Sequence, residues 1–150
     1  MNNMKRLKLA LIAMAMMACY TSCHTSGART TSAHFITATS TGIGAFNASG
    51  IDVTTDGAVG AKISIQGEVT GSQRRLIISI NPYAGITGAI TLGGTSNSAI
   101  MFYSALADTL IMSAHGTITL TSVTPDVAGT FSYTGSDSSV VTGSFNAPTP

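Results

Sequence analysis

The chain has 150 residues, of which 9% are charged and 44% are hydrophobic, with a formal net charge of +1 and no tryptophan. This length fits one domain of ordinary size. So few basic residues exclude the basic footprint of a nucleic-acid-binding protein. Thr, Ser, Asn and Gly must instead form much of the surface, which is common in extracellular β-proteins and unusual in cytosolic helical ones.

The N-terminus has the pattern of a secretory leader. Lys5, Arg6 and Lys8 form a basic region, and residues 9–18 that follow are apolar without interruption. The run is too short for a transmembrane helix, which needs roughly 20 apolar residues. We therefore predict that residues 1–22 are a signal peptide and that the polar residues 23–33 are a flexible tether. Without the three basic residues of the leader, four basic and six acidic residues remain, a net charge of −2.

Both cysteines lie at the end of this apolar run, each after a small residue: Ala18 precedes Cys19, and Ser22 precedes Cys23. In bacteria this arrangement resembles the lipobox, in which the thiol is acylated and the chain is cut just before it. We predict Cys23 as the lipid attachment site, because the polar tether starts directly after it, with Cys19 as the alternative. Ordinary leader cleavage would leave free thiols, and two cysteines cannot complete a zinc site. The predicted partner is a membrane, held through the lipid, and the predicted location is the cell envelope, most simply the outer membrane.

Alternating hydrophobic residues predict that residues 34–150 form a single β-rich domain. Residues 62–69 and 74–81 both alternate with period two, so residues 62–81 read as a hairpin, which Pro82 and Gly85 end. Residues 104–114 allow a short helix or a strand, and flanking β-branched and aromatic residues favour the strand. We expect an all-β fold, an antiparallel sandwich or barrel with at most one short helix. Further strands are expected at residues 86–92, 98–105, 116–123, 127–135 and 138–146.

The last third of the chain repeats a short pattern of a glycine, a hydroxyl residue and a large apolar residue. The repeats begin at Gly116, Gly129 and Gly143. If all three are strands, one face of a C-terminal three-strand meander carries Ile118, Leu120, Phe131, Tyr133, Val141 and Phe145. We interpret the glycines as sites of close backbone packing rather than as a ligand site.

The stretch GTITLTSVTPDVAGTFSYTGSDSSVVTGSFNAP, residues 116–148, resembles the C-terminal signature of a family of uncharacterised lipoproteins from Bacteroidetes-type bacteria. Residues 35–49 resemble the opening strand pair of that family more loosely. The resemblance implies a lipid-anchored, all-β envelope protein and brings no catalytic residues with it. Phe46 departs from the family pattern, in which many members carry tryptophan.

Few residues suggest chemistry. No nucleophile elbow, phosphate loop or zinc-protease motif is present. Asp108 and His115 could join one of many serines in a hydrolase triad, but a chance occurrence is the simpler interpretation. His34 and His115 are expected to be strand-end residues, and we predict no metal site and no cofactor. Residues 52–57 begin like a calcium loop, but Ile63 stands where a glutamate is needed, so a hairpin turn at residues 54–59 is preferred.

Two classes of function remain. The first is a non-catalytic module that binds a small molecule, glycan or protein; the second is a structural envelope lipoprotein without a specific ligand, with a hydrolase as an outside alternative. A binding module needs a pocket with aromatic and polar groups. The only candidate cluster is Tyr83, Phe102 and Tyr103, for which core packing is the preferred interpretation.

Overall fold

The fold is taken from a computed structural model of the chain, which describes residues 33–56 and 62–150. These residues form ten strands and no helix, so the described part contains no helix able to cross a bilayer. The strands are β1 (Phe35–Ser40), β2 (Gly44–Ala48), β3 (Gly50–Asp56), β4 (Lys62–Val69), β5 (Arg74–Ile80), β6 (Gly88–Gly93), β7 (Ala99–Ser104), β8 (Thr109–Ser122), β9 (Asp126–Gly135) and β10 (Val140–Pro148).

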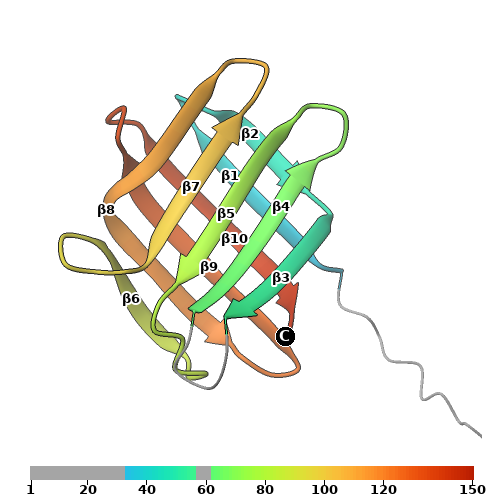
Figure 1. Cartoon of the computed structure of the whole chain (residues 1–150), viewed down its shortest axis with the longest axis vertical. Coiled ribbons are helices and arrows are strands. Elements are labelled where there is room, and N and C mark those ends of the chain that lie inside the picture. Colours follow the sequence, from blue (N-terminus) through green and yellow to red (C-terminus); the bar gives the residue numbers. More distant parts are fainter. Residues whose placement is uncertain (1–32, 57–61) are drawn as a thin grey trace, which may run out of the picture. The chain divides into compact units, whose positions relative to one another are not determined.

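The strands curl into a nearly closed antiparallel barrel (Figure 1). Their order is β2-β1-β10-β9-β8-β7-β5-β4-β3, with β6 also paired to β8. The first strand, β1, pairs with the last, β10. The two ends of the order, β2 and β3, are successive stretches of chain separated only by Ser49. The predicted all-β class is therefore confirmed. The sequence allowed a sandwich or a barrel, and the observed sheet is barrel-like.

One long strand, β8, belongs to both halves of the barrel. Its first four residues pair with β7, whereas residues 115–120 pair with β6 along the same edge. β9 pairs along the opposite edge, with bulges between Ser113 and His115 and between Leu120 and Ser122. A bulge bends a strand and strengthens its twist, and the two bulges let β8 pass from one half of the barrel into the other. β8 thus forms a corner of the barrel.

Most of the predicted strands are present. β4 and β5 form the predicted 62–81 hairpin, and β7 and β8 pair through a turn at residues 105–108, as the strand interpretation of residues 104–114 requires. One expectation was wrong: residues 109–114 and 116–123 are not separate strands but parts of β8. The bulge after Ser113 accommodates the change of register without ending the strand. The predicted β8-β9-β10 meander is confirmed.

Apolar side chains fill the interior of the barrel. They come from alternate residues of each strand, as the period-two pattern predicts. In the meander, all six residues predicted to share one face are buried: Ile118, Leu120, Phe131, Tyr133, Val141 and Phe145.

Each repeated glycine lies opposite an aromatic residue of the neighbouring strand. Gly116 pairs with Tyr133, Gly129 with Phe145, and Gly143 with Phe131. A Cβ atom added to Gly143 would lie 2.3 Å from the Cζ atom of Phe131 and 2.2 Å from the carbonyl oxygen of Thr37. The rings and the backbone occupy the space that a side chain would need. The three glycines are therefore packing positions, as interpreted from the sequence.

Arg74 connects β5 to β2 near the seam between β2 and β3, the two ends of the strand order, where the described residues form no ladder. Its guanidinium donates to the carbonyl oxygens of Ala45, at 3.0 Å, and Ile43. It also lies 5.9 Å from the ring centroid of Phe46 and 5.3 Å from that of Phe102, within cation–π range. The two rings meet edge to face, with centroids 6.2 Å apart. The seam is thus held by side chains rather than by a strand ladder.

Candidate functional site

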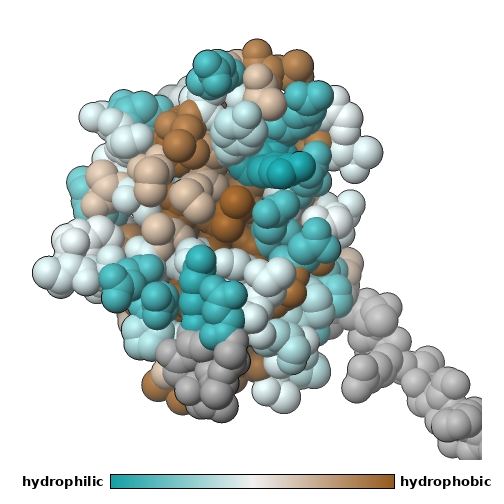
Figure 2. Space-filling model, in the orientation of Figure 1, coloured by the Kyte–Doolittle hydropathy of each residue, from teal (hydrophilic) through white to brown (hydrophobic). Residues whose placement is uncertain are grey.

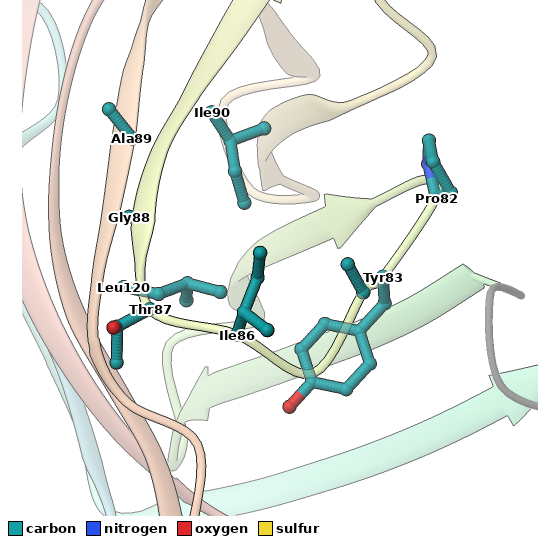
Figure 3. Close-up of a pocket in the computed structure, with 9 residues that line it drawn as sticks. Pro82, Tyr83, Ile86, Thr87, Gly88, Ala89, Ile90 and Leu120 are labelled. Carbon is teal, nitrogen blue, oxygen red and sulfur yellow. The ribbon is translucent and has the colours of Figure 1, made fainter.

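A small apolar pocket lies between β6 and the segment that connects β5 to β6 (Figure 3). Its volume is about 140 Å³. Tyr83 and Ile86 come from the connecting segment, Ile90 from β6 and Leu120 from β8, as the labelled side chains show. The full lining is Pro82, Tyr83, Ala84, Ile86, Thr87, Gly88, Ala89, Ile90 and Leu120.

Serine hydroxyls form hydrogen bonds at both ends of residues 81–98, the segment between β5 and β7 that includes β6 and carries the pocket. The buried Ser98 side chain accepts from the backbone N–H of Asn81 at 3.0 Å, just before the pocket segment begins. The Ser96 side chain donates to the carbonyl oxygen of Thr91 at 2.7 Å and accepts from the N–H of Ser98 at 3.1 Å. Gly85, with φ of +65°, supplies a left-handed position in the connecting segment. Fixed ends leave the pocket largely pre-formed.

The lining of the pocket is mostly apolar. The lining has no charged residue and no histidine, and Tyr83 is its one titratable side chain. Burial raises the pKa of the Tyr83 phenol above its ordinary value, which keeps the group neutral. An engineered apolar cavity of about 150 Å³ takes up benzene, so this pocket matches an apolar group about the size of one aromatic ring.

The structure separates the three aromatic residues of the predicted cluster. Phe102 is buried in the core against Phe46, as preferred from the sequence. Tyr83 packs partly against the core and lines the pocket. Tyr103 is 40% exposed on the outer face, so the core interpretation was wrong for it. The alternation along β7 turns successive residues to opposite faces, which parts Phe102 from Tyr103.

The outer face of the barrel carries an apolar patch that the sequence reading missed. We call it the outer patch; its members are Ile77, Met101, Tyr103, Leu110 and Met112. Neighbouring strands place Ile77 opposite Met101, Met101 opposite Met112 and Tyr103 opposite Leu110. Figure 2 shows apolar atoms gathered on this face over β5, β7 and β8. The available signal was the run at residues 110–112, where apolar residues occupy both faces of one strand.

The proposed triad residues do not meet. Asp108 lies in the turn before β8, and His115 lies in the middle of β8. Seven positions of extended chain span roughly 20 Å, so the two side chains have no common site. His115 is exposed beside the bulge rather than at a strand end, which corrects that expectation. His34 directly precedes β1, as expected, and its Nε2 atom lies 3.4 Å from the Oδ1 atom of Asp126.

No group of three His, Cys, Asp or Glu side chains that could hold a metal ion occurs in the described residues. Asp52 and Asp56 lie along β3, which pairs with β4 up to the Asp56–Lys62 pair. That pairing agrees with the preferred hairpin, but residues 54–56 of the predicted turn belong to β3, and residues 57–61 lie outside the described ranges. Cys19, Cys23 and His24 also lie outside them, as do the predicted leader and nearly all of the tether.

The buried phenol of Tyr133 is a polar group without a hydrogen bond to any described residue. Tyr133 is 1% exposed, and burial, together with the charge of Asp137, raises its pKa to about 12. A buried hydroxyl without a partner costs stability. Tyr133 is therefore a place where removal of a polar atom should help the fold.

We expect Tyr133→Phe to leave the free energy of unfolding at pH 8 unchanged or to raise it by about 1 kcal/mol or more. The phenol pKa is about 12 in the fold against an ordinary value of 10.0. The fold therefore disfavours the ionised phenol: its stability is unaffected by this group's titration below pH 10 and falls as the pH rises from 10 to 12, because the unfolded chain ionises first. Urea unfolding at pH 8 and pH 11 should show a smaller alkaline loss in Tyr133→Phe. The exposed Tyr103→Phe is the control, and an equal alkaline loss in wild type and Tyr133→Phe would contradict the assignment.

Comparisons with known proteins give no match: no family model, no curated protein and no solved structure is significantly similar to this chain.

Proposed function

We propose that this protein is an exported cell-envelope lipoprotein whose β-barrel is a non-catalytic binding module. Cys23 carries the lipid, with Cys19 as the alternative, and the anchor places the domain at the outer membrane. The pocket formed by Tyr83, Ile86 and Ile90 is the observation that supports a binding function. The ligand is a molecule that presents an apolar group about the size of one aromatic ring.

Three features of the pocket support this proposal. Its walls are apolar, which favours an apolar group by the hydrophobic effect. Ile86, on the wall, is 68% exposed, so an apolar group that entered would also cover this side chain. The serine hydrogen bonds at both ends of residues 81–98 reduce the conformational entropy lost on binding, because the walls are already held in place. The lining also includes two hydroxyl-bearing residues, Tyr83 and Thr87, which are the candidate partners for a polar end of the ligand.

Benzene tests the pocket directly, with hexanoate as a second probe that carries a polar end. We expect both to shift the NMR signals of the methyl groups of Ile86, Ile90 and Leu120, because these methyl groups lie on the pocket walls. Ile86→Asp should abolish the shifts of the Ile90 and Leu120 signals by placing a charge in the apolar wall. Leu106→Asp is the matched control, since Leu106 is 75% exposed in the turn between β7 and β8 and is not part of the pocket.

If neither probe moves these methyl signals, the binding proposal fails and the structural lipoprotein becomes the better interpretation. If the probes bind Ile86→Asp as well as the wild type, they bind elsewhere on the barrel, and the pocket is not the site.

A further inference from the structure

The strand β6 leaves one edge of the barrel open beside the pocket. In the described part of the chain it pairs only with β8. An unpaired edge presents backbone N–H and C=O groups that can pair with another strand. Residues 84–89 are all exposed, which leaves the start of this edge accessible.

The hydrogen bonds at the end of β6 show which backbone groups face this edge. The carbonyl oxygen of Thr91 accepts from the side chain of Ser96, and that of Gly93 accepts from the backbone N–H of Ser96. Both carbonyls therefore point away from β8. Alternate residues of an antiparallel strand direct their N–H and C=O groups to the same side. The N–H and C=O groups of Ala89, and the N–H group of Thr91, accordingly face the open edge.

The edge of β6 lacks the residues that commonly protect an exposed strand edge. Proteins commonly protect edge strands with charged residues or proline. β3, the strand at one end of the barrel order, carries Asp52 and Asp56. β6 carries neither device, and residues 82–98 contain no charged residue. The open edge of β6 is thus chemically suited to pairing with another strand.

We propose that β6 binds an extended peptide segment of another protein, which adds a strand to its open edge and places an apolar side chain in the pocket. This deepens the proposed function, on which it rests, by naming the class of partner. Main-chain pairing supplies affinity in such complexes, and a pocket for alternate side chains supplies specificity. The pocket lining includes Gly88, Ala89 and Ile90 of β6 itself, so side-chain pocket and backbone edge are adjacent.

A second copy of this chain fits the site less well. If two β6 strands paired, the partner would offer its own β6 side chains. Of these, Leu92 is already buried in its own core and Ile90 is packed against that core. Ile86 precedes the strand and forms a wall of its own pocket. Symmetric pairing would leave both pockets unfilled, whereas the strand of another protein fills them.

The test uses the full chain and a seven-residue peptide that alternates threonine with leucine. Its amides along one edge are N-methylated to prevent self-association. On binding, the N–H groups of Ala89 and Thr91 should exchange with solvent at about one tenth of their former rate or more slowly, because they become hydrogen-bonded to the peptide backbone. A peptide methylated on every amide should not bind. Peptide binding that leaves both exchange rates unchanged would overturn the strand addition.

Thr91→Pro removes one outward N–H group without touching the pocket lining, and Thr91→Val keeps that group. We expect Thr91→Pro to weaken peptide binding about tenfold, or roughly 1.4 kcal/mol, while benzene still shifts the methyl signals. Thr91→Val should bind the peptide like the wild type.

If Thr91→Pro does not fold, the exchange rates of the wild type decide the question. Benzene binding without any peptide binding would overturn this inference and leave the pocket intact. A stable dimer that pairs through β6 would also overturn it.

Discussion

Replacing Gly116 by alanine is expected to lower the free energy of unfolding by about 3–5 kcal/mol, which combines overpacking with backbone strain. A Cβ atom at this position would lie 2.3 Å from the carbonyl oxygen of Ser132 and 2.6 Å from the Cα atom of Tyr133. These are backbone atoms of β9, which cannot move without disturbing the ladder. Gly116 also has φ of +155°, a conformation that residues with side chains rarely adopt.

Gly50→Ala is the matched control for this measurement. Gly50 also lies in a strand, but nothing lies within 4 Å of its added Cβ atom, and its φ is not in the left-handed region. Alanine there should be neutral or stabilise the fold by up to about 1 kcal/mol, because it restricts the unfolded chain. Urea unfolding of both variants measures the difference. Equal stabilities would mean that β8 does not form a tight corner at Gly116.

Replacing Cys23 by alanine is expected to abolish incorporation of labelled palmitate and to release the protein from the membrane fraction. Each buried methylene of a lipid anchor contributes about 0.8 kcal/mol, and stable attachment needs more than one chain. Loss of the single attachment residue should therefore remove the whole anchor. The measurement is palmitate labelling and fractionation of bacterial cells that express the full chain.

Cys19→Ala is the control for the anchor, because it removes the other thiol of the same segment. It should keep full labelling. Labelling that persists in Cys23→Ala and disappears in Cys19→Ala would move the anchor to Cys19. Labelling of neither wild type nor variants would instead favour ordinary leader cleavage.

The strands could be predicted because alternation is a local property. Ile63 and Ile65 are buried along β4, and Leu76 and Ile78 along β5, as their spacing indicates. The continuity of β8 was not predictable in the same way. It depends on β6 and β7 sharing one edge of that strand, which is a relation between distant segments.

The candidate site was largely hidden from the sequence for the same reason. Tyr83 was named as a candidate, but Ile86, Ile90 and Leu120 look like ordinary apolar residues until the connecting segment folds against β6. The open edge of β6 follows from which strands do not pair with it, and no local pattern records that. The absence of charge in residues 82–98 was the one visible signal.

The pairing of β1 with β10 determines when the barrel can close. A chain is synthesised from its N-terminus, so β1 emerges early and can pair with β2, but its other neighbour, β10, appears much later. Loop closure over such a distance is slow compared with the formation of hairpins. A nascent chain can therefore form local hairpins but not the complete barrel while its C-terminal strand is still being made.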